Sequence, residues 1–108
     1  MTSLDESAFW QVAAPYLERP GVTRSTMMGY PCLRLHGDFF ASWDPHHLQL
    51  VAKLDRIAAT NMIDTAQAEA FAPSGKRFRE WVAVPIDNRD RWETILEAAF
   101  GHALRRSE

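Results

Sequence analysis

The sequence predicts a two-layer α+β domain in which an antiparallel five-stranded sheet carries its helices on one face. Four short runs, at about 22–28, 31–36, 39–43 and 47–53, are separated only by brief turn signals. Connections this short join antiparallel neighbours. The chain begins and ends with segments whose apolar residues recur at helical spacing. The predicted order is α-β-β-β-β-α-β-α, and helices segregated on one face of such a sheet make two layers.

Length and composition indicate one ordinary globular domain over residues 1–108. The hydrophobic fraction is 46% and the charged fraction is 24%, both common values for such domains. The net charge of −2 argues against a nonspecific nucleic-acid binder, which usually has a basic excess, so we expect no direct nucleic-acid binding. No apolar run approaches the roughly 18 residues that span a bilayer. With no secretory signal pattern and a single cysteine, we expect a cytoplasmic location.

The first helix is predicted to begin at a capping box, "SLDE" at 3–6, in which a hydroxyl and a carboxylate satisfy backbone N–H groups. Pro15 removes a hydrogen bond, so we expect a kink or break there. "RPG" at 19–21 ends the segment. The expected inward residues are Phe9, Val12, Ala13, Tyr16 and Leu17.

The turn at Gly37 sets the register of the central strands. A two-residue turn, Gly37–Asp38, would place Leu35 opposite Phe40 and spoil the alternation of the next strand. A three-residue loop over 36–38 places Leu35 opposite Phe39 and collects the apolar residues on one face. We therefore predict the three-residue loop, with Phe39 more buried than Phe40. The predicted core face contains Leu33, Leu35, Phe39, Ala41, Trp43, Leu48, Leu50 and Ala52.

The second half of the chain supplies a helix, a strand and a helix. Asp55 is predicted to cap a helix over about 55–65, and "FREWVAVP" at 78–85 is the predicted fifth strand. The inward residues of that strand are Phe78, Val82 and Val84, and the outward ones are Arg79, Trp81 and Ala83. Asp87 is expected to cap the last helix. Its apolar stripe is Trp92, Ile95, Leu96, Ala99, Phe100 and Ala103.

Four motifs carry a family resemblance: "MMG" at 27–29, "GDFFA" at 37–41, "LVAKL" at 50–54 and "FREWVAVP" at 78–85. In this order and spacing they resemble the TfoX/Sxy N-terminal domain family, with the MmcQ/YjbR-like domains as near relatives. The resemblance covers about residues 9–104. Met28 stands where that family typically has Phe, and a single glycine replaces its frequent pair.

The resemblance implies a small mixed α/β domain similar to the type III secretion chaperones, often found as a homodimer. It carries over no catalytic residues. The best-known members of that family are regulators of natural competence that act through other proteins, and they have a second, helical domain. The 108-residue sequence includes no such domain, so we do not expect the competence role to transfer. We expect a non-enzymatic interaction or regulatory module that forms a homodimer or binds a protein partner.

Two groups of polar residues resemble a metal site and a catalytic pair, but their spacing argues against both. His46 and His47 beside Asp44 suggest a metal, but adjacent turn residues rarely aim at one ion and no further ligand joins them at the right spacing. We expect a polar turn there, and no metal or cofactor. Cys32 and His36 stand too far apart on a strand to act as nucleophile and base. Cys32 is therefore expected to be a small buried apolar residue.

The candidate interaction surface is the sheet face expected to carry no helix. It comprises Arg34, Phe40, Val51, Lys53, Arg79 and Trp81. Trp and Arg are enriched at interface centres, which favours contact with a second copy or a protein partner. Two alternatives stay open. The basic side chains can simply cover a solvated face, or Lys53, Arg79 and Trp81 can surround a pocket for an anionic small molecule, in a binding protein or an undiscovered enzyme.

Overall fold

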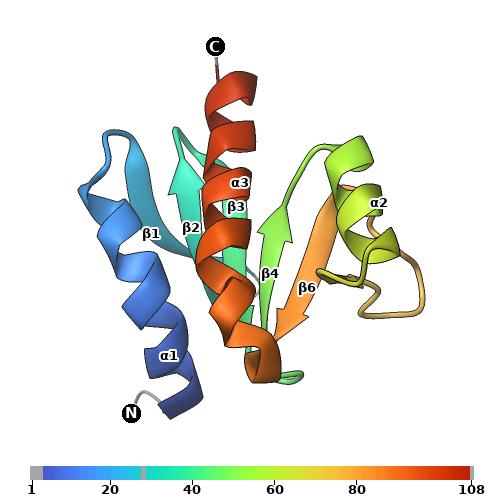
Figure 1. Ribbon diagram of the computed structural model, residues 1–108. Helices are drawn as coiled ribbons and strands as arrows, with labels where there is room; N and C mark the ends of the chain where they lie inside the picture. The colour runs from blue at the N-terminus through green and yellow to red at the C-terminus, as the bar shows by residue number, and fades with distance from the viewer. Residues whose placement is uncertain (1–3, 28, 108) are drawn as a thin grey trace.

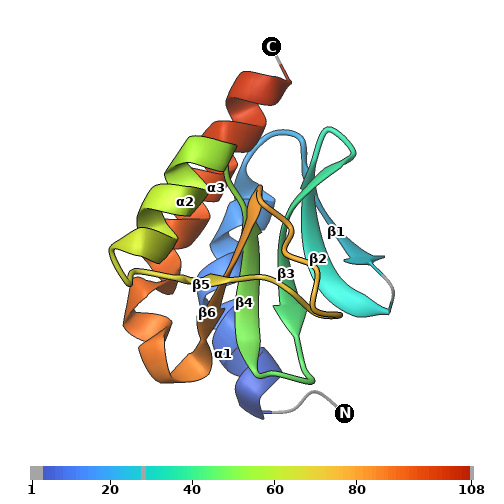
Figure 2. The ribbon, with the colours of Figure 1, turned by 90° about the vertical axis from the view of Figure 1, so that its right-hand side faces the viewer.

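The computed structural model describes residues 4–27 and 29–107 and has two layers (Figure 1). An open antiparallel sheet of six strands in the order β1-β2-β3-β4-β6-β5 forms one layer. The helices α1, α2 and α3 all lie on one face of this sheet (Figures 1 and 2). The α+β class and the placement of the helices are therefore as predicted.

The boundaries of the elements agree with most of the predicted ranges. In chain order they are α1 (Leu4–Ala13), the 3₁₀ helix η1 (Ala14–Glu18), β1 (Val22–Met27), β2 (Tyr30–Leu35), β3 (Asp38–Asp44), β4 (Gln49–Lys53), α2 (Arg56–Asp64), β5 (Glu69–Ala70), β6 (Trp81–Pro85), the 3₁₀ helix η2 (Ile86–Arg91) and α3 (Trp92–Arg106). The strand count is six rather than the predicted five, because β5 adds a two-residue edge strand to β6. A strand that short shows no alternation in the sequence.

The predicted break at Pro15 is confirmed. The α-helix ends at Ala13 and continues as a 3₁₀ helix with Pro15 in its first turn, where the missing N–H costs no hydrogen bond. Ser3, half of the predicted capping box, lies outside the described residues. The Glu6 carboxylate accepts a hydrogen bond of 3.1 Å from Nε1 of Trp10.

The β2–β3 turn differs from the predicted loop over 36–38. Leu35 pairs with Asp38, so the turn consists of two residues, His36 and Gly37. Both have positive φ angles, 51° and 89°, as expected for the two-residue hairpin turns that match the twist of the strands. The loop prediction was wrong because it allowed only for unbroken alternation in the strands.

A β-bulge in β3 shifts the pairing by one residue, so that the apolar residues after the turn again face the core. Arg34 pairs with Phe39. The next pair joins Leu33 to Ala41, so Phe40 is the extra residue. Phe40 turns toward the helices and is 1% exposed, whereas Phe39 is partly exposed on the other face. The prediction that Phe39 is the more buried of the two was therefore wrong.

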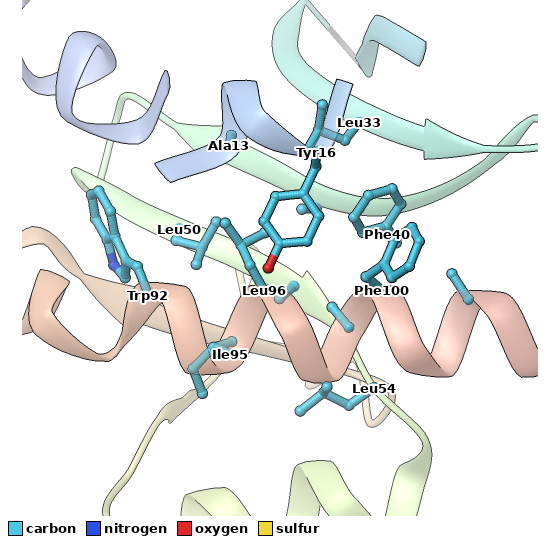
Figure 3. Packing of buried hydrophobic residues seen from close by; sticks show 14 of the residues in the cluster. Ala13, Tyr16, Leu33, Phe40, Leu50, Leu54, Trp92, Ile95, Leu96 and Phe100 are labelled. Carbon is cyan, nitrogen blue, oxygen red and sulfur yellow. The ribbon is translucent and has the colours of Figure 1, made fainter. Parts of the chain in front are cut away.

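The core fills the space between the sheet and the helices. The rings of Phe40 and Phe100 meet edge to face in it, with Tyr16 beside them (Figure 3). The whole predicted stripe of α3 is buried: Trp92, Ile95, Leu96, Ala99, Phe100 and Ala103. Leu48, predicted in the core, is 40% exposed because it lies in the turn before β4 with a φ of 50°.

The predicted N-terminal cap is present in α2 but not in α3. Asp55 accepts hydrogen bonds from the backbone N–H groups of Ile57 and Ala58 and caps α2, as predicted. Asp87 does not cap α3, because it lies inside η2, which leads into that helix. The start of α3 is held instead by Trp92, whose indole Nε1 donates a hydrogen bond of 2.9 Å to the carbonyl oxygen of Val84 in β6.

The face without helices is partly covered by a loop. Figure 2 shows the segment 71–80 running from the β5 edge onto the side of the sheet opposite the helices. The N–H of Phe78 donates to the carbonyl oxygen of Phe71 at 2.9 Å and closes this excursion. The predicted fifth strand therefore begins only at Trp81, and Phe78 belongs to the loop.

Candidate functional site

The six residues of the predicted interaction surface do not form one patch. Phe40 is in the core, which corrects its predicted place on the open face. Val51 lies on the expected face but is only 3% exposed, so it offers little contact surface. Arg34 stacks on Phe39, with its guanidinium carbon 4.1 Å from the ring centroid. The other three, Lys53, Arg79 and Trp81, line one depression.

This depression has a volume of about 340 Å³. It lies where β4 ends, α2 begins and β6 starts. Its lining residues are Lys53, Arg56, Phe78, Arg79, Glu80 and Trp81. We refer to it as the Lys53 depression.

Backbone hydrogen bonds fix the walls of the Lys53 depression. Lys53 and Trp81 are directly paired across β4 and β6, which brings their side chains together. The N–H of Leu54 donates to the carbonyl oxygen of Glu80 at 2.8 Å. The N–H of Trp81 donates to the carbonyl oxygen of Phe78 at 3.0 Å and closes a four-residue turn. The site is therefore built on the end of the sheet rather than on a free loop.

The side chain of Lys53 is mostly buried but only loosely paired. It is 20% exposed, and its Nζ lies 3.8 Å from Oε2 of Glu80. A charge-assisted hydrogen bond is about 2.7–2.9 Å long, so this contact is an ion pair without a close bond. Nζ also lies 6.0 Å from the ring centroid of Trp81, at the outer limit of a cation–π contact. A buried ammonium is stabilised by close partners, and a bound anion would supply one.

The lining of the Lys53 depression is cationic. Lys53, Arg56 and Arg79 contribute three positive charges, against one carboxylate from Glu80. The nearby carboxylate of Asp55 is engaged with its own helix, since its Oδ1 accepts from two backbone N–H groups at 3.0 and 2.9 Å. The excess positive charge of the lining therefore comes from its side chains, because Asp55 offsets the positive end of the α2 dipole.

Aromatic rings form the remaining wall. Phe78 is 45% exposed, which is high for a large apolar side chain. Its ring is supported by Phe71, with the two centroids 5.8 Å apart. Trp81 is partly buried beside it. The depression thus combines cationic groups with ring surface that a ligand can contact.

Sequence reasoning found half of this site. Phe78 and Glu80 were missed because the sequence predicts a strand over 78–81, where the structure has a turn. Arg56 was missed because it lies in the predicted helix rather than on the predicted sheet face. The turn contains neither Gly nor Pro, so the usual signal was lacking. The adjacent charged residues Arg79 and Glu80 were the available hint, since such residues are not typical of a strand start.

The other polar groups considered in the sequence are structural. Asp44 accepts hydrogen bonds from the N–H groups of His46 and His47, from Nδ1 of His47 and from Nε2 of Gln49. Burial favours a higher pKa for Asp44, but these hydrogen bonds outweigh it and the pKa is lowered. Cys32 is fully buried, as predicted, and burial raises the pKa of its thiol. In the described ranges, no cluster of three or more His, Cys, Asp or Glu residues could hold a metal ion.

Within residues 4–27 and 29–107, no helix has both the length and the apolar character needed to cross a bilayer. Comparison of the chain with protein-family models, with curated proteins and with solved structures gave no match. The resemblance to the TfoX/Sxy N-terminal domain family therefore stays a prediction based on the four motifs.

Proposed function

We propose that this chain is a non-enzymatic binding module and that the Lys53 depression takes up an anionic group of its ligand or partner. The proposal rests on the burial and the loose pairing of the Lys53 side chain. Its side chain is four-fifths buried, yet its ammonium lies 3.8 Å from the nearest carboxylate oxygen. A carboxylate or phosphate group entering the depression would complete the coordination of that ammonium.

The rest of the lining supports the same function. Arg56 and Arg79 add guanidinium groups, which bind carboxylates and phosphates through paired hydrogen bonds. The depression lies outside the core and is bounded by fixed backbone, so a ligand can enter it without disrupting the fold.

A homodimer or a protein partner is the second candidate. It is favoured by Phe78, one of the few large apolar side chains that remain exposed among the described residues. Exposed aromatic residues beside arginines are typical of interface centres. In that case an acidic side chain of the partner would occupy the depression.

The proposed function can be tested by NMR titration with citrate as the probe anion. The sequence has four tryptophans, so the indole N–H signal of Trp81 is assigned from a Trp81→Phe variant. We expect citrate to shift that signal saturably in the wild type. Lys53→Met, which keeps the aliphatic stem and removes the charge, should weaken binding by about tenfold or more, or about 1.4 kcal/mol.

Lys76→Met is the matched control. Lys76 is the other lysine of the sequence and is exposed outside the depression, so this variant should bind citrate as the wild type does. No saturable shift of the Trp81 signal, or an equal loss in both lysine variants, would contradict the proposal.

A further inference from the structure

We infer that the ligand of the Lys53 depression is a small planar aromatic anion, with its ring against Phe78 and Trp81 and its carboxylate or phosphate at Lys53, Arg56 and Arg79. This inference rests on the proposed function and specifies the ligand class.

The turn over 78–81 places two aromatic side chains at its ends. Its closing hydrogen bond runs from the N–H of Trp81 to the carbonyl oxygen of Phe78. The first and fourth residues of such a turn have Cα atoms less than about 7 Å apart. Both side chains line the same depression, so a flat ligand can contact the two rings together.

These rings are held in place before any ligand arrives. Phe78 packs on Phe71 with an interplanar angle of 33°, and their backbones are joined by a hydrogen bond of 2.9 Å. The backbone of Trp81 is fixed by its pairing with Lys53, whose ammonium lies 6.0 Å from the Trp81 ring centroid. Rigid aromatic side chains lose little conformational entropy on binding, so they are effective contacts for a planar ring.

The site is large enough for a small ligand. A volume of about 340 Å³ is near the lower end of the range of ligand pockets, about 300–1,000 Å³. The neighbouring sheet surface offers no extension, because its central residues are already buried. These residues are Cys32, Ser42, Val51 and Ala83. A ring system with one acidic group fills a site of this kind.

The charges restrict the ligand further. The cationic groups accept either a carboxylate or a phosphate. The carboxylate of Glu80 lies in the same depression, 3.8 Å from the Lys53 ammonium, and repels an acidic group bound at Lys53. The geometry therefore favours a ligand whose acidic group also reaches Arg56 and Arg79, which offset this repulsion.

The inference can be tested with a matched pair of probes in the same NMR titration. 2-Naphthoate and its saturated counterpart, decahydronaphthalene-2-carboxylate, carry the same acidic group on the same carbon skeleton, but only the first is aromatic and planar. We expect naphthoate to bind about tenfold more tightly or better. 1-Naphthyl phosphate then distinguishes the two acids, since it binds better than naphthoate only if the site is built for phosphate.

Variants of Phe78 locate the aromatic contact. Phe78→Leu keeps an apolar side chain and should reduce the advantage of naphthoate to less than about threefold. Phe78→Tyr keeps the ring and should preserve most of that advantage. Lys76→Met again serves as the control that retains wild-type affinity for both probes. Far-UV circular dichroism checks that each variant is folded.

The outcomes separate the two proposals. If citrate shifts the Trp81 signal but naphthoate has no advantage over decahydronaphthalene-2-carboxylate, the aromatic ligand class is overturned and the proposed function stands. If neither citrate nor the carboxylates bind at the Trp81 signal, both are overturned. Tighter binding of a hexaglutamate peptide than of naphthoate would overturn the small ligand in favour of a protein partner.

Discussion

Two clusters of charged and aromatic residues invite comparison, one between η1 and α3 and the other in the Lys53 depression. In the first, Arg19 donates two hydrogen bonds of 3.2 and 3.0 Å to the two carboxylate oxygens of Glu97. The hydroxyl of Tyr16 donates a third, at 2.8 Å. In the second, the ammonium of Lys53 has its nearest carboxylate oxygen at 3.8 Å.

The two clusters differ in how closely their charged groups are paired. The Arg19 guanidinium also lies 4.3 Å from the ring centroid of Tyr16 and 4.6 Å from that of Phe100, so two of its donors and its flat face are occupied. This first cluster ties η1 to α3. The Lys53 depression also contains a cationic donor and aromatic rings, but the Lys53 ammonium has no close hydrogen bond to a carboxylate. Such an ammonium can form a shorter bond with an anion from outside the chain.

The largest effect is expected from Trp92→Ala, because Trp92 supports both clusters. It anchors α3, which carries Glu97, to β6, which carries Trp81, through its hydrogen bond to Val84. Its side chain is fully buried, so its loss should cost about 3–5 kcal/mol of unfolding free energy. Chemical denaturation measures this. A loss below about 1 kcal/mol would show that the anchor is unimportant.

Removing the cation of each cluster should change the free energy of unfolding by different, smaller amounts. Arg19→Met removes the bidentate pair and should lower the free energy of unfolding by about 1 kcal/mol. Lys53→Met should change it by less than about 0.5 kcal/mol, because a loosely paired ammonium adds little to stability. Denaturant titrations of the two variants side by side give the answer. Equal losses would remove the distinction drawn between the clusters.

The pH dependence of stability tests the contribution of Glu97, the carboxylate of the first cluster. The hydrogen bonds from Arg19 and then from Tyr16 lower the pKa of Glu97. A carboxylate with a lowered folded-state pKa stabilises the fold above its unfolded pKa, and this contribution disappears as the pH falls through the folded value. Glu97 is more than half exposed, so solvent screening keeps the effect below about 1 kcal/mol.

We therefore expect wild type and Glu97→Gln to differ more in stability at pH 7 than at pH 3. Asp44, whose pKa is also lowered, titrates in both proteins and cancels in the difference. Denaturation midpoints at the two pH values provide the measurement, and a difference that grows toward pH 3 would contradict the role given to Glu97.

The smallest effect concerns assembly. The sequence predicts a homodimer with Trp81 in its contact. If the Lys53 depression holds a small anion, however, Trp81→Ala should leave the molar mass unchanged. Light scattering at high micromolar concentration, with wild type and variant measured together, distinguishes the cases. A wild-type dimer that becomes a monomer on mutation would favour the interface over the small ligand.

Most of the fold could be predicted from the sequence because its signals are local and repeated. The apolar stripe of α3 recurs over about three turns, from Trp92 to Ala103, and Asp55 stands directly before its helix. The bulge could not be predicted, because a single extra residue leaves no periodic signal. Half of the site was found, since the turn over 78–81 that brings Phe78 and Glu80 to the depression contains no Gly or Pro.

The bulge at Phe40 also bears on how β3 can change in length. The bulge adds one residue to β3 relative to the paired strand β2. Phe40 and Ala41 therefore both pack in the core, while Phe39 contacts Arg34 on the other face. Removing one residue from this stretch would produce a hairpin of regular alternation. The register predicted from the sequence contains the same residues but places the extra one in the turn over 36–38 instead of in the strand, and the two phenylalanines exchange their environments between the two registers.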